Sequence, residues 1–239
     1  MGFVQEPRQP FLRAPSSAVW LIALLVAAHM GRVLAPAQLS DNILVNYAFI
    51  PARYSHAYLA AHGLNPGSIF EQALPFVSYM LLHAGLAHLA INCVWLLAFG
   101  AVVARRIDAL LFFLFFVLCG IAGAAVHLAF NWGSAAPVIG ASGAISGLMA
   151  MGFRIVGGSR PVDGGPLELA PILSSRILIW SAVWIGVNIL AGVTGLGNGA
   201  EPHLVAWQVH LGGYAAGLLL AGPFVAIQDR YMHPRASLG

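Results

Sequence analysis

Hydrophobic residues are gathered into six long runs along the chain, and the stretches between these runs carry most of the charged side chains. A helix needs about 20 largely apolar residues to cross the hydrocarbon core of a bilayer. Each run is near or above that length, so the pattern predicts an all-α membrane protein with six spanning helices. Their expected ranges are 17–34, 76–103, 109–130, 140–156, 177–193 and 204–227.

The remaining stretches predict two short tails, at residues 1–15 and 228–239, and one long loop at residues 35–74. Loops of this length are uncommon and are usually functional. This loop contains several aromatic residues, which suit a segment lying in the headgroup region. No break in composition indicates a second domain, so residues 1–239 are expected to form a single membrane domain.

The composition supports this class, because 59% of the residues are hydrophobic and only 8% are charged, against about 25% charged in a soluble domain. Cys93 and Cys119 fall inside apolar runs and are interpreted as small buried side chains. No HExxH motif occurs, and no carboxylate lies inside an apolar run. These features argue against an intramembrane zinc or aspartyl protease and against a carboxylate-based proton pump. We therefore expect no metal and no cofactor.

The arginines predict the orientation in the membrane. Six spans place both termini on one side, and nine of the eleven basic residues lie on that side, with only Arg32 and Arg53 opposite. Arginine is enriched on the cytoplasmic side, so the termini are expected to be cytoplasmic, and the long loop and the start of the fourth helix outside. The positive net charge follows from this bias and indicates no nucleic-acid partner. The nine basic residues on the side of the termini are Arg8, Arg13, Arg105, Arg106, Arg154, Arg160, Arg176, Arg230 and Arg235.

Two runs carry faces of small residues beside a candidate nucleophile and a candidate base. In the fourth run, Gly143 and Gly147 lie on one helical face directly after Ser142. In the sixth run, Gly217 shares a face with His210. Glycines at this spacing let two helices approach closely. Packing of the two faces would bring His210 to Ser142.

This pairing has a chemical purpose, because a serine hydroxyl is a weak nucleophile until a base such as neutral histidine takes its proton. No carboxylate is available in the apolar runs to orient His210, so the prediction is a dyad. Asn92 and His88, in the outer half of the second run, and the Ser142 amide could stabilise an oxyanion. Taken singly, each histidine is better explained as a hydrogen bonder between helices, and Ser142 as bonded to its own helix. Their occurrence together at one depth favours catalysis.

Three motifs in this order, HAGLAHLAIN, GASGAISG and HLGGYAAG, resemble the rhomboid intramembrane serine proteases, and NYAFIPARY resembles loop sequences of bacterial members. The resemblance covers residues 18–227 and implies a six-helix rhomboid-like bundle in a bacterial inner membrane. It implies that Ser142 is the nucleophile and His210 the general base. His88 and Asn92 would line the oxyanion hole, with Gly140 and the Ser142 amide beside them. The implied partners are the lipid bilayer and transmembrane protein substrates, cleaved near the outer face.

Two positions depart from the family pattern. Many members have a glutamate four residues past Gly100, where this chain has Ala104 followed by arginines. The position four past the nucleophile is often an aromatic residue that stacks on the catalytic histidine, whereas here it is Ser146. The Ser146 hydroxyl is a candidate to bond the imidazole instead.

The alternatives are a catalytically silent rhomboid-like protein that binds membrane helices, and a small-solute channel or transporter. Retention of both Ser142 and His210 argues against the silent relative. The lack of an intramembrane charge and of a detectable inverted repeat argues against a transporter. Serine endopeptidase activity is therefore the leading prediction.

The fifth run is the candidate gate for substrate. It is short, about 17 apolar residues, and a glycine-rich stretch from Gly192 to Gly199 follows it. Trp180 and Trp184 could wedge this helix against the second one and yield to a substrate entering from the lipid. Alternatively, the two tryptophans are interface anchors or fill space against lipid.

Overall fold

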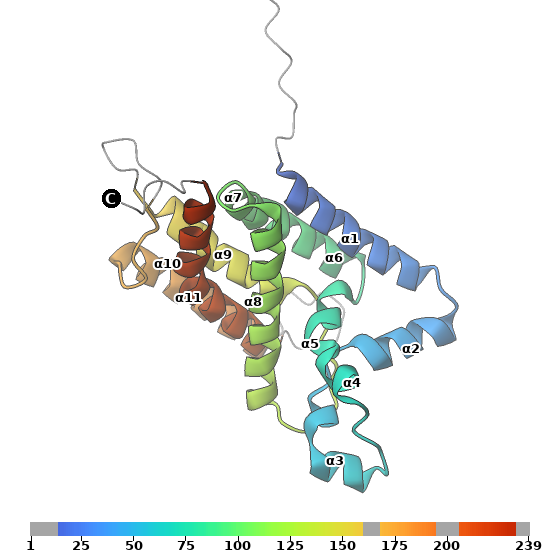
Figure 1. Cartoon of the computed structure of the whole chain (residues 1–239). Coiled ribbons are helices and arrows are strands. Elements are labelled where there is room, and N and C mark those ends of the chain that lie inside the picture. Colours follow the sequence, from blue (N-terminus) through green and yellow to red (C-terminus); the bar gives the residue numbers. More distant parts are fainter. Residues whose placement is uncertain (1–13, 160–167, 195–205, 233–239) are drawn as a thin grey trace, which may run out of the picture.

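The protein is described by a computed structural model that covers residues 14–159, 168–194 and 206–232. These residues form helices joined by short connections, and their only β-type pairs are two isolated bridges. The helices, labelled in Figure 1, are α1 Ser16–Val33, α2 Ala37–Tyr47, η1 Pro51–Tyr54, α3 His56–Ala61, α4 Ile69–Ala73, α5 Pro75–Ser78, η2 Tyr79–Leu81, α6 Leu86–Trp95, η3 Leu96–Gly100, α7 Ala101–Ala104, α8 Ala109–Phe130, α9 Ser142–Val156, α10 Ser175–Thr194 and α11 Trp207–Met232.

Five described helices are long and apolar enough to cross a membrane: α1, the continuous segment Leu86–Ala104 made of α6, η3 and α7, α8, α10 and α11. The sixth apolar helix, α9, has 15 residues, a length of about 22 Å at the α-helical rise per residue. It is shorter than the range 140–156 predicted, because Gly140 has a φ of +119°, which no helix residue adopts. The chain is thus an all-helical integral membrane protein with one short inner helix.

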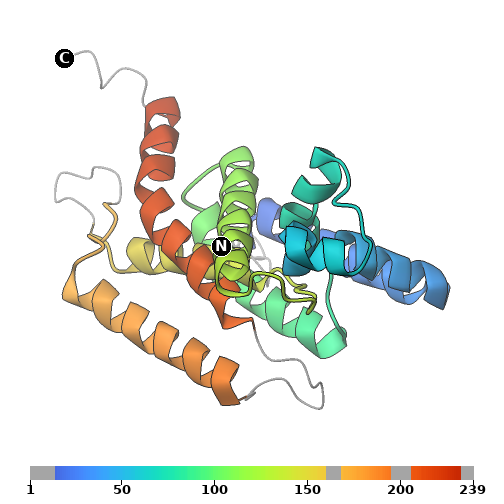
Figure 2. The same cartoon turned by 90° about the horizontal axis from the view of Figure 1, so that it is seen from below.

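Helices α8, α9 and α11 pack side by side at the centre of the bundle (Figures 1 and 2). A Cβ added at Gly213 would overlap the carbonyl of Gly143, and one at Gly217 would overlap the carbonyl of Gly147. Cys119, in the third of these helices, α8, lies against Gly147. The close contact between the small-residue faces of α9 and α11 is therefore confirmed.

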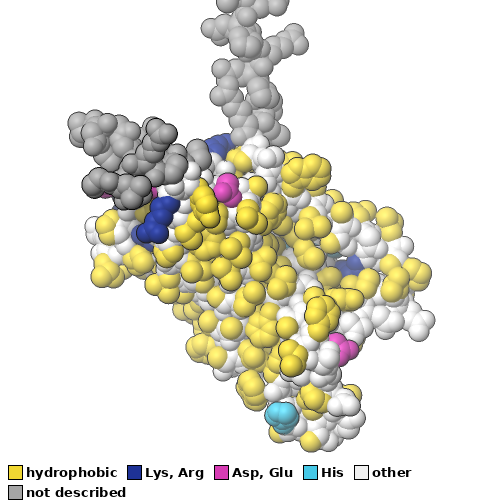
Figure 3. Space-filling model, viewed as in Figure 1, with side chains coloured by type: hydrophobic (Ala, Val, Ile, Leu, Met, Phe, Trp, Pro, Cys, Tyr) yellow, Lys and Arg dark blue, Asp and Glu magenta, His cyan; other side chains and the backbone are white. Residues whose placement is uncertain are grey.

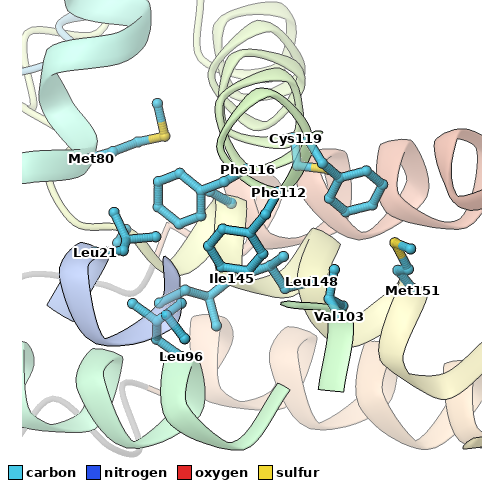
Figure 4. Close-up of a cluster of buried hydrophobic side chains, with 14 of the residues drawn as sticks. Leu21, Met80, Leu96, Val103, Phe112, Phe116, Cys119, Ile145, Leu148 and Met151 are labelled. Carbon is cyan, nitrogen blue, oxygen red and sulfur yellow. The ribbon is translucent and has the colours of Figure 1, made fainter. Parts of the chain in front are cut away.

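Helix α9 is buried along most of its length, from Gly143 to Gly152. A helix that is apolar on every side is stable only when other helices surround it. Figure 4 shows side chains of α8 and α1 closing around it, and this hydrophobic core holds the N-terminus of α9 in place. The core includes Leu21, Leu96, Phe112, Phe115, Phe116, Ile145 and Leu148.

The second apolar run does not form one helix over 76–103. The short helices α5 and η2 are separated from α6 by residues 82–85, and both Leu82 and Gly85 have extended backbones. Because the spanning helix begins at Leu86, His83 precedes it and His88 lies in its first turn. His88, at the start of α6, lies next to Gly140 just before α9.

The predicted long loop at 35–74 is also more ordered than expected, since it contains α2, η1, α3 and α4. Phe49 and Val138 form an antiparallel bridge with N···O distances of 3.0 and 2.8 Å. The bridge ties the loop to the chain just before α9. Phe49 is fully buried, so this segment packs as part of the bundle.

The ends of two later helices also differ from the predictions. Helix α10 has 20 residues rather than about 17, and Gly192 lies inside it, against the indole of Trp207. The rest of this glycine-rich stretch, residues 195–199, lies outside the described residues. Helix α11 continues past residue 228 because Gln228 accepts from the Asp108 amide at 2.9 Å and Asp229 pairs with Arg106 at 2.7 Å.

The surface agrees with a membrane location. Hydrophobic side chains cover most of the helical face seen in Figure 3, and the few charged side chains there are scattered. Large apolar residues are exposed along all the long helices, including Trp20, Val94, Leu110 and Val183. Such a surface is stable against lipid rather than against water.

Candidate active site

Ser142 is the first residue of α9 and is placed there by an unusual backbone. The positive φ of Gly140 turns the chain into the helix, and its N–H donates to the Tyr79 carbonyl at 2.9 Å. A Cβ at Gly140 would lie 2.8 Å from Nε2 of His88, so only glycine fits at this turn. The first amides of a helix have no partner within it. The amide of Ser142 therefore lies at the positive end of the α9 dipole.

The structure brings Ser142 and His210 together. Oγ of Ser142 lies 2.7 Å from Nε2 of His210, within hydrogen-bond distance. The two residues come from α9 and α11, whose backbones meet where Gly213 faces the Gly143 carbonyl. The glycine contact thus fixes the distance between a hydroxyl and a ring nitrogen that are 68 residues apart in the chain.

The other ring nitrogen has a partner that the sequence did not reveal. Nδ1 of His210 lies 2.6 Å from Oδ1 of Asn188, a residue of α10 that is 4% exposed. The signal available in the sequence was an asparagine inside an apolar run, since such residues usually face the bundle interior. The sequence analysis considered a carboxylate as the group that could orient His210 and did not identify this carboxamide.

Ser146 does not bond the imidazole. Its hydroxyl donates to the Ser142 carbonyl at 2.8 Å, the usual choice for a serine inside a helix. Since Asn188 already occupies Nδ1 of His210, the ring has no position left for Ser146. The hydrogen bond from Ser146 to the imidazole, which the sequence left open, is therefore not formed.

His88 and Asn92 lie one turn apart on one face of α6. Nδ1 of His88 accepts a long hydrogen bond from the Ala84 amide at 3.4 Å, which leaves the proton of the neutral ring on Nε2. That nitrogen lies next to Gly140, close to Ser142. Nδ2 of Asn92 donates to the His88 carbonyl at 2.9 Å, and Asn92 is buried. Gly140 lines this space, but its own amide is already bonded to Tyr79.

A row of histidines continues from His88 toward α1. The His83 ring contacts the His88 ring edge to face at a centroid distance of 5.1 Å, and the His29 ring at 6.5 Å. The Arg32 guanidinium donates to the His83 carbonyl at 2.8 Å. These contacts anchor the connection between η2 and α6. Among the described residues, no group of three or more His, Cys, Asp or Glu side chains is placed to hold a metal ion.

The two tryptophans of the predicted gate pack differently. The Trp184 ring meets the Trp95 ring of α6 edge to face, with centroids 6.2 Å apart. The Trp180 ring instead packs on Phe153 of α9 at 5.2 Å. Of the two, Trp184 is therefore the one in contact with the second spanning segment.

Residues 71–227 match the family model of the Rhomboid domain, which is more than half of the 239 residues. The matched range contains α6, α9, α10 and α11. It therefore includes Ser142, His210 and Asn188, together with His88, Asn92 and Gly140. No curated protein matches the chain.

Proposed function

The chain belongs to the rhomboid family, and from this premise we propose that it is an intramembrane serine endopeptidase. It hydrolyses peptide bonds in or near transmembrane segments of membrane proteins. The observation that carries the proposal is the 2.7 Å distance between Oγ of Ser142 and Nε2 of His210. A base at this distance can take the hydroxyl proton as the serine attacks.

The proposed reaction has two stages. In the first, Ser142 Oγ bonds to the scissile carbonyl carbon while its proton passes to His210 Nε2. Collapse of the tetrahedral intermediate breaks the C–N bond, and His210 returns the proton to the leaving amine. In the second stage, water attacks the acyl carbon while His210 takes the water proton. Collapse of this second intermediate breaks the bond between the acyl carbon and Ser142 Oγ, the proton returns from His210 to Oγ, and the carboxyl product leaves.

The oxyanion formed in both stages needs donors that are already in place. The Ser142 amide at the start of α9 is one, and the dipole of α9 favours negative charge there. His88 is a second, since its Nδ1 accepts from Ala84 and its Nε2 therefore carries the proton. Asn92 is a third, because its Nδ2 has two protons and only one is used by the His88 carbonyl.

The proposed setting is a bacterial inner membrane with the termini in the cytoplasm. The arginine distribution along the sequence supports this orientation, and places the N-terminus of α9 toward the outer face. A helix as short as α9 cannot cross the roughly 30 Å hydrocarbon core, so Ser142 at its outer end lies below the membrane surface. The partners would be spanning helices that enter from the lipid.

The proposed entrance lies between α6 and α10. Only 17% of the most apolar stretch of α10 is buried inside the protein, against 28–44% for the other four spans. Figure 2 shows α10 at the edge of the bundle, beside α11. Trp184 and Trp95 meet in the contact between α10 and α6. Separation of this contact would open a path from the lipid to Ser142.

The test is cleavage of a model transmembrane substrate by the purified chain in proteoliposomes. Ser142→Ala and His210→Ala should each lower kcat by at least about 1000-fold, since the members of such a unit fail together. Ser146→Ala is the matched control, because it removes a hydroxyl one turn further along α9 that bonds only its own helix. A fluorophosphonate should label the unaltered chain and the control, but not Ser142→Ala. Cleavage that survives both dyad substitutions would refute the proposal.

A further inference from the structure

Asn188 is a polar residue buried in an otherwise apolar part of α10. Its side chain makes two hydrogen bonds: Oδ1 to His210 Nδ1 at 2.6 Å, and Nδ2 to the Trp184 carbonyl at 2.8 Å. Burying a carboxamide in a membrane protein is costly unless its groups are bonded. Here the oxygen and the NH2 group are both bonded, and the bond of the oxygen connects α10 to α11.

These two bonds determine which end of the carboxamide faces the imidazole. The Trp184 carbonyl can only accept, so the group that contacts it must be the Asn188 NH2. The group facing His210 is then the carboxamide oxygen, which also can only accept. The reverse orientation would place two carbonyl oxygens against each other. Bonding within α10 thus fixes an acceptor against Nδ1.

An acceptor at Nδ1 selects one tautomer of the neutral ring. Nδ1 must carry the proton to donate to Asn188, so Nε2 is left unprotonated and faces the Ser142 hydroxyl at 2.7 Å. This is the tautomer that can remove the serine proton. With the other tautomer, Nε2 would present a proton to Ser142 and could not act as a base.

An asparagine suits this position better than an aspartate would in an apolar surrounding. A carboxylate buried without a charged partner is costly, and α10 contains no acidic residue. The acid in α11, Asp229, is paired with Arg106 at the other end of that helix. A neutral acceptor orients the imidazole and accepts the Nδ1 proton without introducing a buried charge.

We propose that Asn188 is the positioning residue of the site: it holds His210 in the Nδ1-protonated tautomer with Nε2 directed at Ser142. The proposal rests on the proposed protease function, and it turns the predicted dyad into a serine–histidine–asparagine arrangement. It also makes α10 part of the reaction centre, since this helix supplies the acceptor and the Trp184 carbonyl that orients it.

The first test compares three variants in the transmembrane-substrate assay. Asn188→Leu removes the acceptor at similar volume and should lower kcat roughly 10- to 150-fold, the worth of a hydrogen bond to a charged group. KM should change little, because the substrate does not touch Asn188. Asn188→Asp keeps an acceptor for Nδ1 but loses the NH2 group that bonds the Trp184 carbonyl, so it should retain more kcat than Asn188→Leu and less than the unaltered chain. Ser181→Ala is the control: it removes the 2.7 Å bond to Tyr214 between the same two helices, and should leave kcat unchanged.

The fluorophosphonate labelling rate should fall with kcat in Asn188→Leu, since that reaction also needs the base. Equal kcat in Asn188→Leu and the unaltered chain would overturn the positioning role. So would an equal loss in Ser181→Ala, which would mean that the helix contact alone matters. The protease proposal fails separately, if cleavage survives both Ser142→Ala and His210→Ala.

A second measurement uses the unaltered chain and does not depend on a variant that folds. ¹⁵N NMR of the histidine side chains distinguishes the two neutral tautomers, and the His210 signals are those missing from His210→Gln. We expect the proton of neutral His210 on Nδ1. A proton on Nε2 would overturn the proposal.

Discussion

The side-chain NH2 group of Asn92 makes one hydrogen bond within α6 and is proposed to make a second one to the oxyanion. One Nδ2 proton goes to the His88 carbonyl, and the other is free for the oxyanion. Asn92→Ala should therefore lower kcat by about 100-fold, the lower end of the usual loss for one such donor, because His88 and the Ser142 amide remain. Turnover of the transmembrane substrate measures this.

The control for this change is Asn131→Ala. Asn131 makes the same bond to a carbonyl four residues earlier, from Nδ2 to the His127 carbonyl at 3.0 Å, but at the end of α8. The Asn131→Ala variant should keep full activity. His88→Ala should cost more than Asn92→Ala, since His88 offers Nε2 to the oxyanion and its ring also contacts His83. Normal turnover in Asn92→Ala would remove this residue from the site.

At the residue scale, the sequence predicted the proximity of Ser142 and His210 but not what surrounds the imidazole. Glycine spacing identifies which helix faces meet, and two such faces brought these residues together. Asn188 has no comparable pattern, because α10 packs through isolated contacts such as that between Ser181 and Tyr214. The sequence therefore did not identify Asn188 as the partner of His210 Nδ1.

At the element scale, the contact between α9 and α11 should be the least tolerant of added volume. A side chain at Gly217 would overlap the Gly147 carbonyl, and backbone cannot move aside as a side chain can. Gly217→Leu should cost about 1–3 kcal/mol of stability. It should lower kcat further than that loss implies, because a displacement of about 1 Å can cost 100-fold in rate.

Thermal unfolding and turnover of Gly217→Leu, measured side by side, check this. Gly31→Leu is the matched control, because a Cβ at Gly31 in α1 meets nothing within 4 Å. That variant should behave as the unaltered chain does. A stable and fully active Gly217→Leu would show that α9 and α11 do not need their close contact.

Helix ends were harder to predict than helix faces. Hydrophobicity alone continued the second run back to residue 76, whereas the extended backbones of Leu82 and Gly85 start α6 only at Leu86. The same measure ended α11 near residue 227, whereas the pair of Arg106 with Asp229 continues it. Both corrections come from backbone conformation or from a contact with another helix, which a hydrophobic pattern does not contain.

At the scale of the whole molecule, the number of apolar helices followed directly from the sequence, and the depth of each did not. Helix α9 is too short to cross the hydrocarbon core, unlike the five longer apolar helices. Its first residue is Ser142, so in the proposed orientation the hydroxyl would lie below the outer membrane surface. Water then has to reach it from the outer side, and a substrate helix from the lipid.

Lateral entry gives the last prediction. Trp184 packs on Trp95 between α10 and α6, so Trp184→Ala should loosen this contact and raise the cleavage rate of a transmembrane substrate. The Trp184 carbonyl, which orients Asn188, is kept in this variant. Hydrolysis of a small soluble ester, which needs no lateral opening, should hardly change. Both rates should be measured in the same proteoliposomes.

A disulfide that joins the outer halves of α6 and α10 should do the reverse, slowing cleavage of the transmembrane substrate while sparing the ester, and reduction should restore the rate. Trp20→Ala is the control, since Trp20 lies on α1 and is 71% exposed. It should alter neither rate. If Trp184→Ala changes both rates equally, the site itself has been disturbed. If it changes neither, α10 is not the gate, because the contact that closes the proposed entrance would then not limit the arrival of substrate at Ser142.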